Sequence, residues 1–190
     1  MPPATTFEKE MILEEAFNII RKDGLVKLTA RNIAHNLGCS TQPVYSEFGS
    51  MKKLQNAVLK KAYQFAIDYF LQEKQSKEIF YTMGLRYFQF SREEKALFKL
   101  LFLEGEYAFT IEKMRQISPP LVERMKQDRN LHSLAEDRIR RIGRDMWIYT
   151  HGLVSMAFFS ELPDIEEFVK TGLLEMGKTV IEWENQQLKG

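Results

Sequence analysis

The chain has 190 residues, 44% of them hydrophobic and 28% charged, with a mean hydropathy of −0.34, a composition typical of a globular protein with one large core or two smaller ones. Its apolar runs are far shorter than the roughly 20 residues that span a bilayer, and its first residues lack the basic and apolar regions of a signal peptide, so we expect a cytoplasmic protein without membrane contact. A net charge of +1 excludes a generally basic nucleic-acid binder, so any DNA-binding surface must be local.

Apolar residues recur every three or four positions along most of the chain, and no alternating strand pattern is present. This pattern predicts an all-α protein of about nine helices. Helix starts are indicated where a capping residue precedes a Glu by three positions, as in Thr5 with Glu8, Ser91 with Glu94, Ser133 with Glu136 and Asp164 with Glu167. The predicted helices cover residues 6–22, 30–37, 41–48, 51–74, 77–91, 92–104, 119–129, 134–160 and 165–187.

The second predicted helix has a clear beginning and end. Thr29 is placed to cap it, and Leu28 and Ile33 have the spacing of a hydrophobic staple. Gly38 suits the left-handed position that stops a helix. A short, well-delimited helix is therefore expected at 30–37, followed by a sharp turn.

The third predicted helix repeats this design. Ser40 is expected to cap it, and Pro43 falls in the first turn, where its missing N–H is not needed. Val44 and Phe48 are expected to face inward, and Cys39 is interpreted as a small packing residue of the turn, since no basic side chain adjoins it to activate the thiol. The outward residues offer an amide and hydroxyls to base edges and phosphates, although a merely solvated polar face has the same composition: they are Thr41, Gln42, Tyr45 and Ser46.

The stretch LTARNIAHNLGCSTQPVYSEFGSMKKL resembles the DNA-binding domain of the TetR family of bacterial transcriptional regulators. The preceding EEAFNIIRKDG resembles the first helix of that domain, and the likeness covers about residues 6–60. It implies a helix-turn-helix at about 28–48, within a DNA-binding domain at 1–55, followed by a helical regulatory and dimerisation domain at 56–190. The matching positions are Thr29, Ile33, Ala34, Gly38, Ser40, Tyr45, Phe48 and Leu54.

Two positions depart from the family pattern. Glu47 stands where the family often has His or Tyr, and Met51 stands where it often has a phosphate-binding Lys. An acidic side chain would repel DNA if it faced it, and Met51 has nothing to donate. Lys52 and Lys53 are adjacent and are expected to replace the missing charge.

Residues 1–60 contain eight basic and six acidic side chains, and their placement matters more than this small excess. The acidic residues concentrate on the first helix. Lys27 and Arg31 flank the start of the second helix, and Lys52 and Lys53 flank the start of the fourth. Because helix N-termini also attract phosphate, these two ends are expected to hold the DNA backbone while residues 41–48 read bases. The alternative is that these are ordinary surface cations. The predicted DNA-binding residues are Lys27, Thr29, Arg31, Ser40, Thr41, Gln42, Pro43, Tyr45, Ser46, Lys52 and Lys53.

The region after residue 75 is rich in aromatic side chains, which usually form ordinary core but can also line a ligand cavity. The segment WIYTHGLVSMAFF resembles a C-terminal type of the TetR family marked by Trp147, His151 and Gly152. The resemblance implies ligand sensing and a dimer whose last two helices form a four-helix interface. A lone His on an apolar helix can equally be a hydrogen-bonded core residue. The candidate ligand-binding residues are Tyr87, Phe102, Tyr107, Trp147 and His151.

A single short recognition helix contacts few base pairs, so DNA binding favours a homodimer on a palindromic site. The predicted function is therefore a ligand-responsive DNA-binding regulator, acting as a repressor that an unknown small-molecule effector releases. The alternative is a helical interaction module that has lost sequence-specific DNA binding. We expect neither an enzyme nor a metal site or cofactor, since no Glu-x-x-His pair, phosphate-binding loop or nucleophile elbow is present, and a single cysteine excludes a cysteine-rich zinc site.

Overall fold

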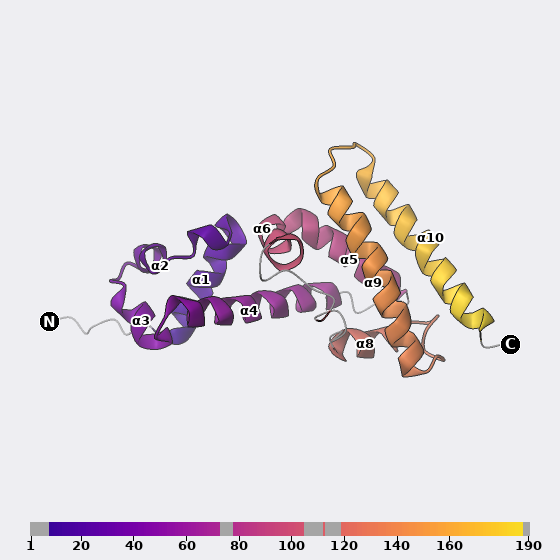
Figure 1. Ribbon diagram of the computed structural model, residues 1–190, viewed down its shortest axis with the longest axis horizontal. Helices are drawn as coiled ribbons and strands as arrows, with labels where there is room; N and C mark the ends of the chain where they lie inside the picture. Colours follow the sequence, from indigo (N-terminus) through magenta and orange to yellow (C-terminus); the bar gives the residue numbers. More distant parts are fainter. Residues whose placement is uncertain (1–7, 73–77, 105–111, 113–118, 188–190) are drawn as a thin grey trace. The chain divides into compact units, whose positions relative to one another are not determined.

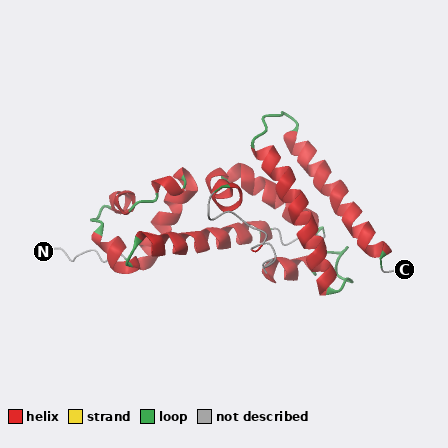
Figure 2. Ribbon diagram, viewed as in Figure 1, coloured by secondary structure: helices red, strands yellow, loops and turns green. Residues whose placement is uncertain are grey.

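The computed structural model describes residues 8–72, 78–104, 112 and 119–187. Within them every regular element is a helix, which confirms the all-α prediction (Figure 2). None of the described helices is long and apolar enough to span a membrane. In chain order the elements are α1 (Lys9–Asp23), the 3-10 helix η1 (Leu25–Lys27), α2 (Ala30–Leu37), α3 (Gln42–Phe48), α4 (Met51–Leu71), α5 (Ile79–Glu93), α6 (Lys95–Phe98), the π-helical turn η2 (Lys99–Leu103), α8 (Pro119–Met125), α9 (Glu136–Phe158) and α10 (Ile165–Gln186) (Figure 1).

The chain divides into two compact units. The first unit comprises Met1–Ala66 and Glu94–Ala108, and the second comprises Ile67–Glu93 and Phe109–Gly190. The division within α4 lies later than the predicted functional boundary at 55/56, and the first unit also takes in α6 and η2. Which residues serve DNA binding and which serve regulation stays a prediction.

In the first unit, α1 packs against η1, α2, α3 and α6. The apolar side of α1 is buried because its residues recur at helical spacing, as Ile12, Ala16 and Ile20 show. Ile33 of α2 and Val44 of α3 are also almost fully buried. The turn between α2 and α3 is thus held on a shared core.

In the second unit, α9 packs against α5, α8 and α10. Helices α9 and α10 lie side by side and run in opposite directions (Figure 1). At Gly172 of α10, a Cβ would lie 2.9 Å from Tyr149 Oη and 3.2 Å from Leu153 Cδ2, so a side chain there would require these two side chains of α9 to shift. Near the end of α10, the buried Glu184 pairs with α9: its Oε2 lies 2.9 Å from Arg138 Nε, outside hydrogen-bond geometry, and its Oε1 accepts from Arg141 Nη1 at 3.4 Å.

Two predicted helix starts are wrong. Ser40 does not cap α3: the N-cap position is Thr41, whose backbone is already right-handed helical and whose side chain makes no capping hydrogen bond. Ser91 does not begin a helix either, because it is buried inside α5 and its hydroxyl donates to the Phe88 carbonyl at 2.6 Å. The predicted helix at 92–104 is instead the short α6 followed by the π-helical turn η2.

The other capping predictions had mixed outcomes. Thr5 lies outside the described residues. The N-cap of α9 is Ala135 rather than Ser133. Asp164 does hold the N-cap position of α10, but its side chain makes no capping hydrogen bond. Sequence spacing therefore located these helix starts to within a few residues, but it did not identify the residues and hydrogen bonds that cap them.

Gly38 provides a direct test of the turn. Its φ is +67°, a conformation that disfavours residues with a Cβ, although no atom would obstruct one. We expect Gly38→Ala to reduce the free energy of unfolding by about 1 kcal/mol, and Gly38→Asn to reduce it less, because Asn tolerates this conformation. Gly177→Ala in α10, where φ is not positive and space is open, should be neutral or stabilising. Denaturant titrations measure all three; an equal loss for Ala and Asn would contradict the backbone explanation.

Candidate nucleic-acid interface

The turn between α2 and α3 is closed by backbone and side-chain hydrogen bonds. Thr29 caps α2 as predicted, since its Oγ1 accepts from Asn32 N at 3.1 Å. At the other end, Gly38 N donates to the His35 carbonyl and Cys39 N donates to the Ala34 carbonyl, at 3.2 and 2.9 Å. These two bonds form a Schellman motif, which confirms the predicted left-handed stop at Gly38.

Helix α3 buries one side and exposes another. Val44 and Phe48 are buried, as predicted, and Cys39 is half-buried in the preceding turn. Gln42, Tyr45 and Ser46 lie on the exposed side, and Tyr45 has 48% of its surface accessible. The exposed residues at and around the start of the helix, here named the polar edge, are Ser40, Thr41, Gln42, Tyr45 and Ser46.

Two α3 residues lie on a flank rather than on the polar edge. At about 100° of rotation per residue, Glu47 projects roughly 140° from Gln42 and roughly 100° from Ser46 around the helix axis. It is exposed there, beside the half-buried Pro43. The acidic side chain therefore points away from the edge that carries Gln42.

The start of α2 brings three predicted residues together. Lys27, Thr29 and Arg31 are all exposed. Sequence reasoning missed Asn32, whose side-chain amide donates to the Lys27 carbonyl at 2.8 Å and so ties η1 to α2. Because the Thr29 oxygen accepts from the backbone, its hydroxyl hydrogen is still available to donate to a phosphate.

The start of α4 is also built from local contacts. Ser50, which sequence reasoning missed, caps the helix, since Lys53 N donates to its Oγ at 3.3 Å; a Ser directly before the helix was the available signal. Gly49 ends α3 with a φ of +73°, and a Cβ there would lie 3.7 Å from Lys53 Nζ. Lys52 and Lys53 are both exposed at this helix start.

Three acidic residues of α1 bind other side chains of the first unit. Lys61 Nζ of α4 lies 2.7 Å from Glu14 and 3.4 Å from Glu10, and its hydrogen bond to Glu14 raises the pKa of Lys61. Glu15 accepts from Asn36 Nδ2 at 2.7 Å. These contacts partly neutralise the acidic helix, which reduces its repulsion of a polyanion.

Three of the predicted ligand-binding residues come together in the second unit. Tyr87 Oη lies 2.9 Å from His151 Nδ1, and the His151 ring stacks on Trp147 with centroids 4.8 Å apart and an interplanar angle of 7°. Burial lowers the pKa of His151 and raises the pKa of Tyr87 well above its usual value. Both groups are therefore neutral near pH 7, and the imidazole tautomer sets which of the two donates in this hydrogen bond. This arrangement fits a hydrogen-bonded core pair as well as the wall of a ligand site.

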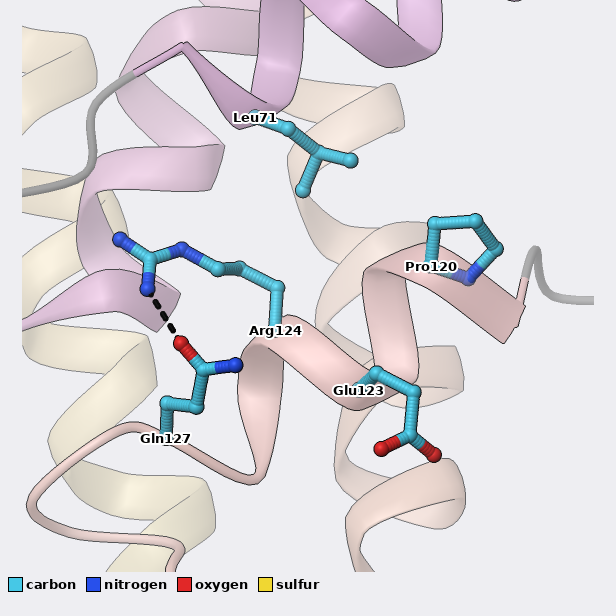
Figure 3. Close-up of a pocket in the computed structure, with 5 residues that line it drawn as sticks. All are labelled: Leu71, Pro120, Glu123, Arg124 and Gln127. Atoms are coloured by element: carbon cyan, nitrogen blue, oxygen red, sulfur yellow. Dashed lines mark hydrogen bonds between the residues drawn. The ribbon is translucent and has the colours of Figure 1, made fainter.

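The other two predicted ligand-binding residues do not join this cluster. Phe102 belongs to the first unit, where its ring lies 5.4 Å from that of Phe98. Tyr107 lies outside the described residues. One open pocket of about 470 Å³ is found in the second unit, but none of the predicted residues lines it (Figure 3). Its lining is formed by Leu71, Pro120, Glu123, Arg124 and Gln127, with Arg124 Nη1 donating to Gln127 Oε1 at 2.6 Å.

A second exposed surface lies on α9. Ile148, Met156 and Phe159 have 53%, 70% and 69% of their surfaces accessible. Phe159 is the C-cap residue directly after α9, and together with Gly152 the three fall within about 80° of one another around the helix axis. A Cβ at Gly152 would meet no atom of this chain within 4 Å. These four residues are here named the α9 apolar face.

No protein-family profile and no curated protein matches this chain. Among solved structures, the crystal structure of a tetR-family transcriptional regulator from Streptomyces coelicolor is similar, with a TM-score of 0.61 and 15% sequence identity. The alignment covers 91% of this chain and 86% of the other. The similarity therefore extends well beyond the helix-turn-helix.

At this low identity the comparison establishes the fold and not the function. It agrees with the helix-turn-helix geometry of α2 and α3 and with the helical second unit, so the chain has the fold of a TetR-family transcriptional regulator.

Proposed function

We propose that the protein is a DNA-binding transcriptional regulator that acts as a cytoplasmic repressor and reads DNA with α3. The observation that carries this proposal is the polar edge of α3. Burial of Val44 and Phe48 orients this edge, and the capped α2 and the turn at Gly38 hold it in place. The similar protein from Streptomyces coelicolor is a transcriptional regulator, which supports the same function.

The polar edge contains groups suited to different parts of DNA. The Gln42 amide can pair with an adenine edge, and the Thr41 hydroxyl can bond to a base or lie against a thymine methyl. The Tyr45 and Ser46 hydroxyls suit phosphate oxygens. The polar edge itself carries no positive charge, so it supplies selectivity rather than most of the affinity.

Affinity is expected from the two helix starts. Lys27, Thr29 and Arg31 lie at the start of α2, and Lys52 and Lys53 at the start of α4, all exposed to solvent. In each place backbone N–H groups and the positive end of the helix dipole add to the side-chain charge. Met51 is half-buried, so the adjacent lysines take over the phosphate contact that a Lys at that position would make.

We expect Lys52→Ala combined with Lys53→Ala to weaken binding to all DNA sequences alike. The slope of log affinity against log salt should become shallower by about two for each bound chain, and so by about four for a bound homodimer, because each chain loses two phosphate contacts. Gel-shift titrations at several salt concentrations measure it. The control is Lys22→Ala with Lys60→Ala, which removes the same charge from exposed positions of the first unit away from these helix starts. An equal change in slope for both pairs would refute a local phosphate contact.

Gln42→Ala should change selectivity rather than general affinity. We expect the preference for the best duplex over its variants at one base pair to fall by about 10-fold, with non-specific binding unchanged, because one good base contact contributes about 1–3 kcal/mol. Binding to duplexes selected from a random pool measures this. Glu47→Gln, on the flank of α3, serves as the control and should leave base preference as it was. An unchanged preference in Gln42→Ala would exclude a base contact by this residue.

The α9 apolar face supports a homodimer. An exposed helix side with Ile148, Met156 and Phe159 around a glycine can be covered by another helix at close range, since Gly152 presents no side chain. Phe168 and Trp183 are exposed on the neighbouring α10 and lie about 60° apart around its axis. We therefore infer that two copies pack through α9 and α10 and place two α3 helices on a palindromic operator.

Replacing Met156 by Glu should shift the protein towards monomer, because a charge would be buried in the interface. The fold of each chain should be retained, since Met156 is 70% exposed within it. Sedimentation equilibrium measures the shift. Val26→Glu is the matched control, because Val26 is 90% exposed in the first unit and away from α9. A dimer as tight as the unsubstituted protein in Met156→Glu would place the interface elsewhere.

The effector is proposed to act on the second unit near Tyr87, Trp147 and His151. These residues already form one neutral, aromatic, hydrogen-bonded group, which suits an uncharged or aromatic ligand. Release from DNA requires that the ligand prefer the chain arrangement that binds DNA less well. Native mass spectrometry of the purified protein, followed by operator titration with any molecule found, tests this step.

A helical interaction module that no longer binds DNA is the second candidate, and the replacement of a phosphate-binding lysine by Met51 favours it. The two candidates differ in one measurement. Gel shifts at low salt against DNA flanking the coding sequence should show binding for the regulator and none for the interaction module.

A further inference from the structure

The start of α1 lies beside the end of α3 in the first unit (Figure 1). Lys9, the first residue of α1, is exposed, and its Nζ lies 5.3 Å from the centroid of the Phe48 ring. Phe48 is the last residue of α3 and is only 6% exposed. The aromatic ring therefore holds a cation at the end of the helix that carries the polar edge.

A second ammonium group lies at the residue that follows. Gly49 directly follows α3, and a Cβ there would lie 3.7 Å from Lys53 Nζ. Lys9 and Lys53 come from different helices, α1 and α4, and both reach the turn formed by Phe48 and Gly49. Sequence reasoning missed Lys9, because nothing in its local sequence places it beside α3.

No neighbouring carboxylate neutralises these two cations. Lys61 of the same unit also lies over an aromatic ring, 5.8 Å from the centroid of Phe17, but its Nζ is bound by Glu14 at 2.7 Å. Lys9 and Lys53, in contrast, form no ion pair with any residue that the structure describes. Their positive charge is therefore left for a group outside this unit.

The acidic residues closest to Lys9 in the sequence do not compete for it. Glu10 projects about 100° from Lys9 around the axis of α1, and its Oε1 lies 3.4 Å from Lys61 Nζ. Glu8, the N-cap residue of α1, is exposed and makes no side-chain capping bond, so its carboxylate can turn to solvent. Glu47 is exposed on the flank of α3.

The length of α3 relates these cations to its polar edge. Its seven residues span about 10 Å at 1.5 Å per residue, close to the width of about 12 Å of the major groove of DNA. With the polar edge at the start of α3 directed at bases, cations at its end reach the sugar–phosphate backbone that borders the groove.

We propose that Lys9 and Lys53 form a phosphate-binding site at the end of α3, in which the first helix contributes a DNA contact of its own. The inference rests on the proposed DNA-binding function, and it adds a contact that neither the start of α2 nor the start of α4 supplies. An ammonium group that lies at a fixed place and lacks a carboxylate partner suits a phosphate oxygen.

The test uses the full chain and a duplex of mixed sequence, so that only sequence-independent binding is measured. Lys9→Met removes the charge but keeps an unbranched side chain over Phe48. We expect the slope of log affinity against log salt to become shallower by about one for each bound chain, and by about two when Lys53→Ala is added. Lys9→Arg keeps the charge and should retain the original slope. Fluorescence anisotropy titrations at several salt concentrations measure these slopes.

Lys22→Met is the matched control, because Lys22 is exposed in the last turn of the same helix, at the opposite end from Lys9. It should leave the slope unchanged. An unchanged slope in Lys9→Met, or an equal change in Lys22→Met, overturns the phosphate site while leaving the proposed function in place. If the unsubstituted protein binds no DNA at low salt, the proposed function fails and the site fails with it.

A second measurement needs no substitution and so does not depend on the folding of a variant. Acetic anhydride acetylates exposed lysines, and peptide mass spectrometry gives the rate at each one. Bound duplex should slow the acetylation of Lys9 and Lys53 several-fold and leave Lys22 and Lys60 unchanged. Equal rates at Lys9 with and without duplex, in a sample where binding is confirmed, would contradict the proposal.

Discussion

Burial of one side of α3 is the constraint on which the proposed DNA-binding geometry depends. Val44 and Phe48 are each at most 6% exposed, and burial of such side chains contributes roughly 1.5–3 kcal/mol apiece. A helix of seven residues is too short to be stable alone, so this packing both forms α3 and sets its rotation. Rotation about the axis decides which residues are presented on which side: Gln42 and Ser46 on the polar edge, Glu47 on the flank.

The positive charge of the first unit lies beside α3 and not on it. Helix α3 carries no basic residue, and the exposed basic residues near it include those at the starts of α2 and α4: Lys27, Arg31, Lys52 and Lys53. The acidic residues of α1 would weaken the attraction of these basic residues for phosphate, but Lys61 and Asn36 bind three of the acidic side chains. A chain with a net charge of only +1 can in this way present a locally positive surface.

Local signals in the sequence predicted most of the first unit. The bounds of α2 and the left-handed Gly38 followed from capping chemistry that involves only neighbouring residues. The prediction that Ser40 caps α3 was wrong for a reason that is also local. Pro43 has no backbone N–H to donate to a capping side chain, and Thr41, at the N-cap position, already has a helical backbone conformation. The prediction that Ser91 begins a helix was wrong because the packing of other helices buries this residue inside α5.

What the sequence by itself determined is most of the helices, the register of α2 and α3, and the composition of the polar edge, because these depend on residues within a few positions of one another. Only the tertiary structure decided which distant residues meet. Arg21 with Glu94 and Tyr87 with His151 are separated by 73 and 64 positions, and no local pattern pairs them. The same holds for the placement of Phe102 in the first unit and for the exposure of the α9 apolar face. These features arise from how helices pack, since the side of a helix that is buried depends on which other helices cover it.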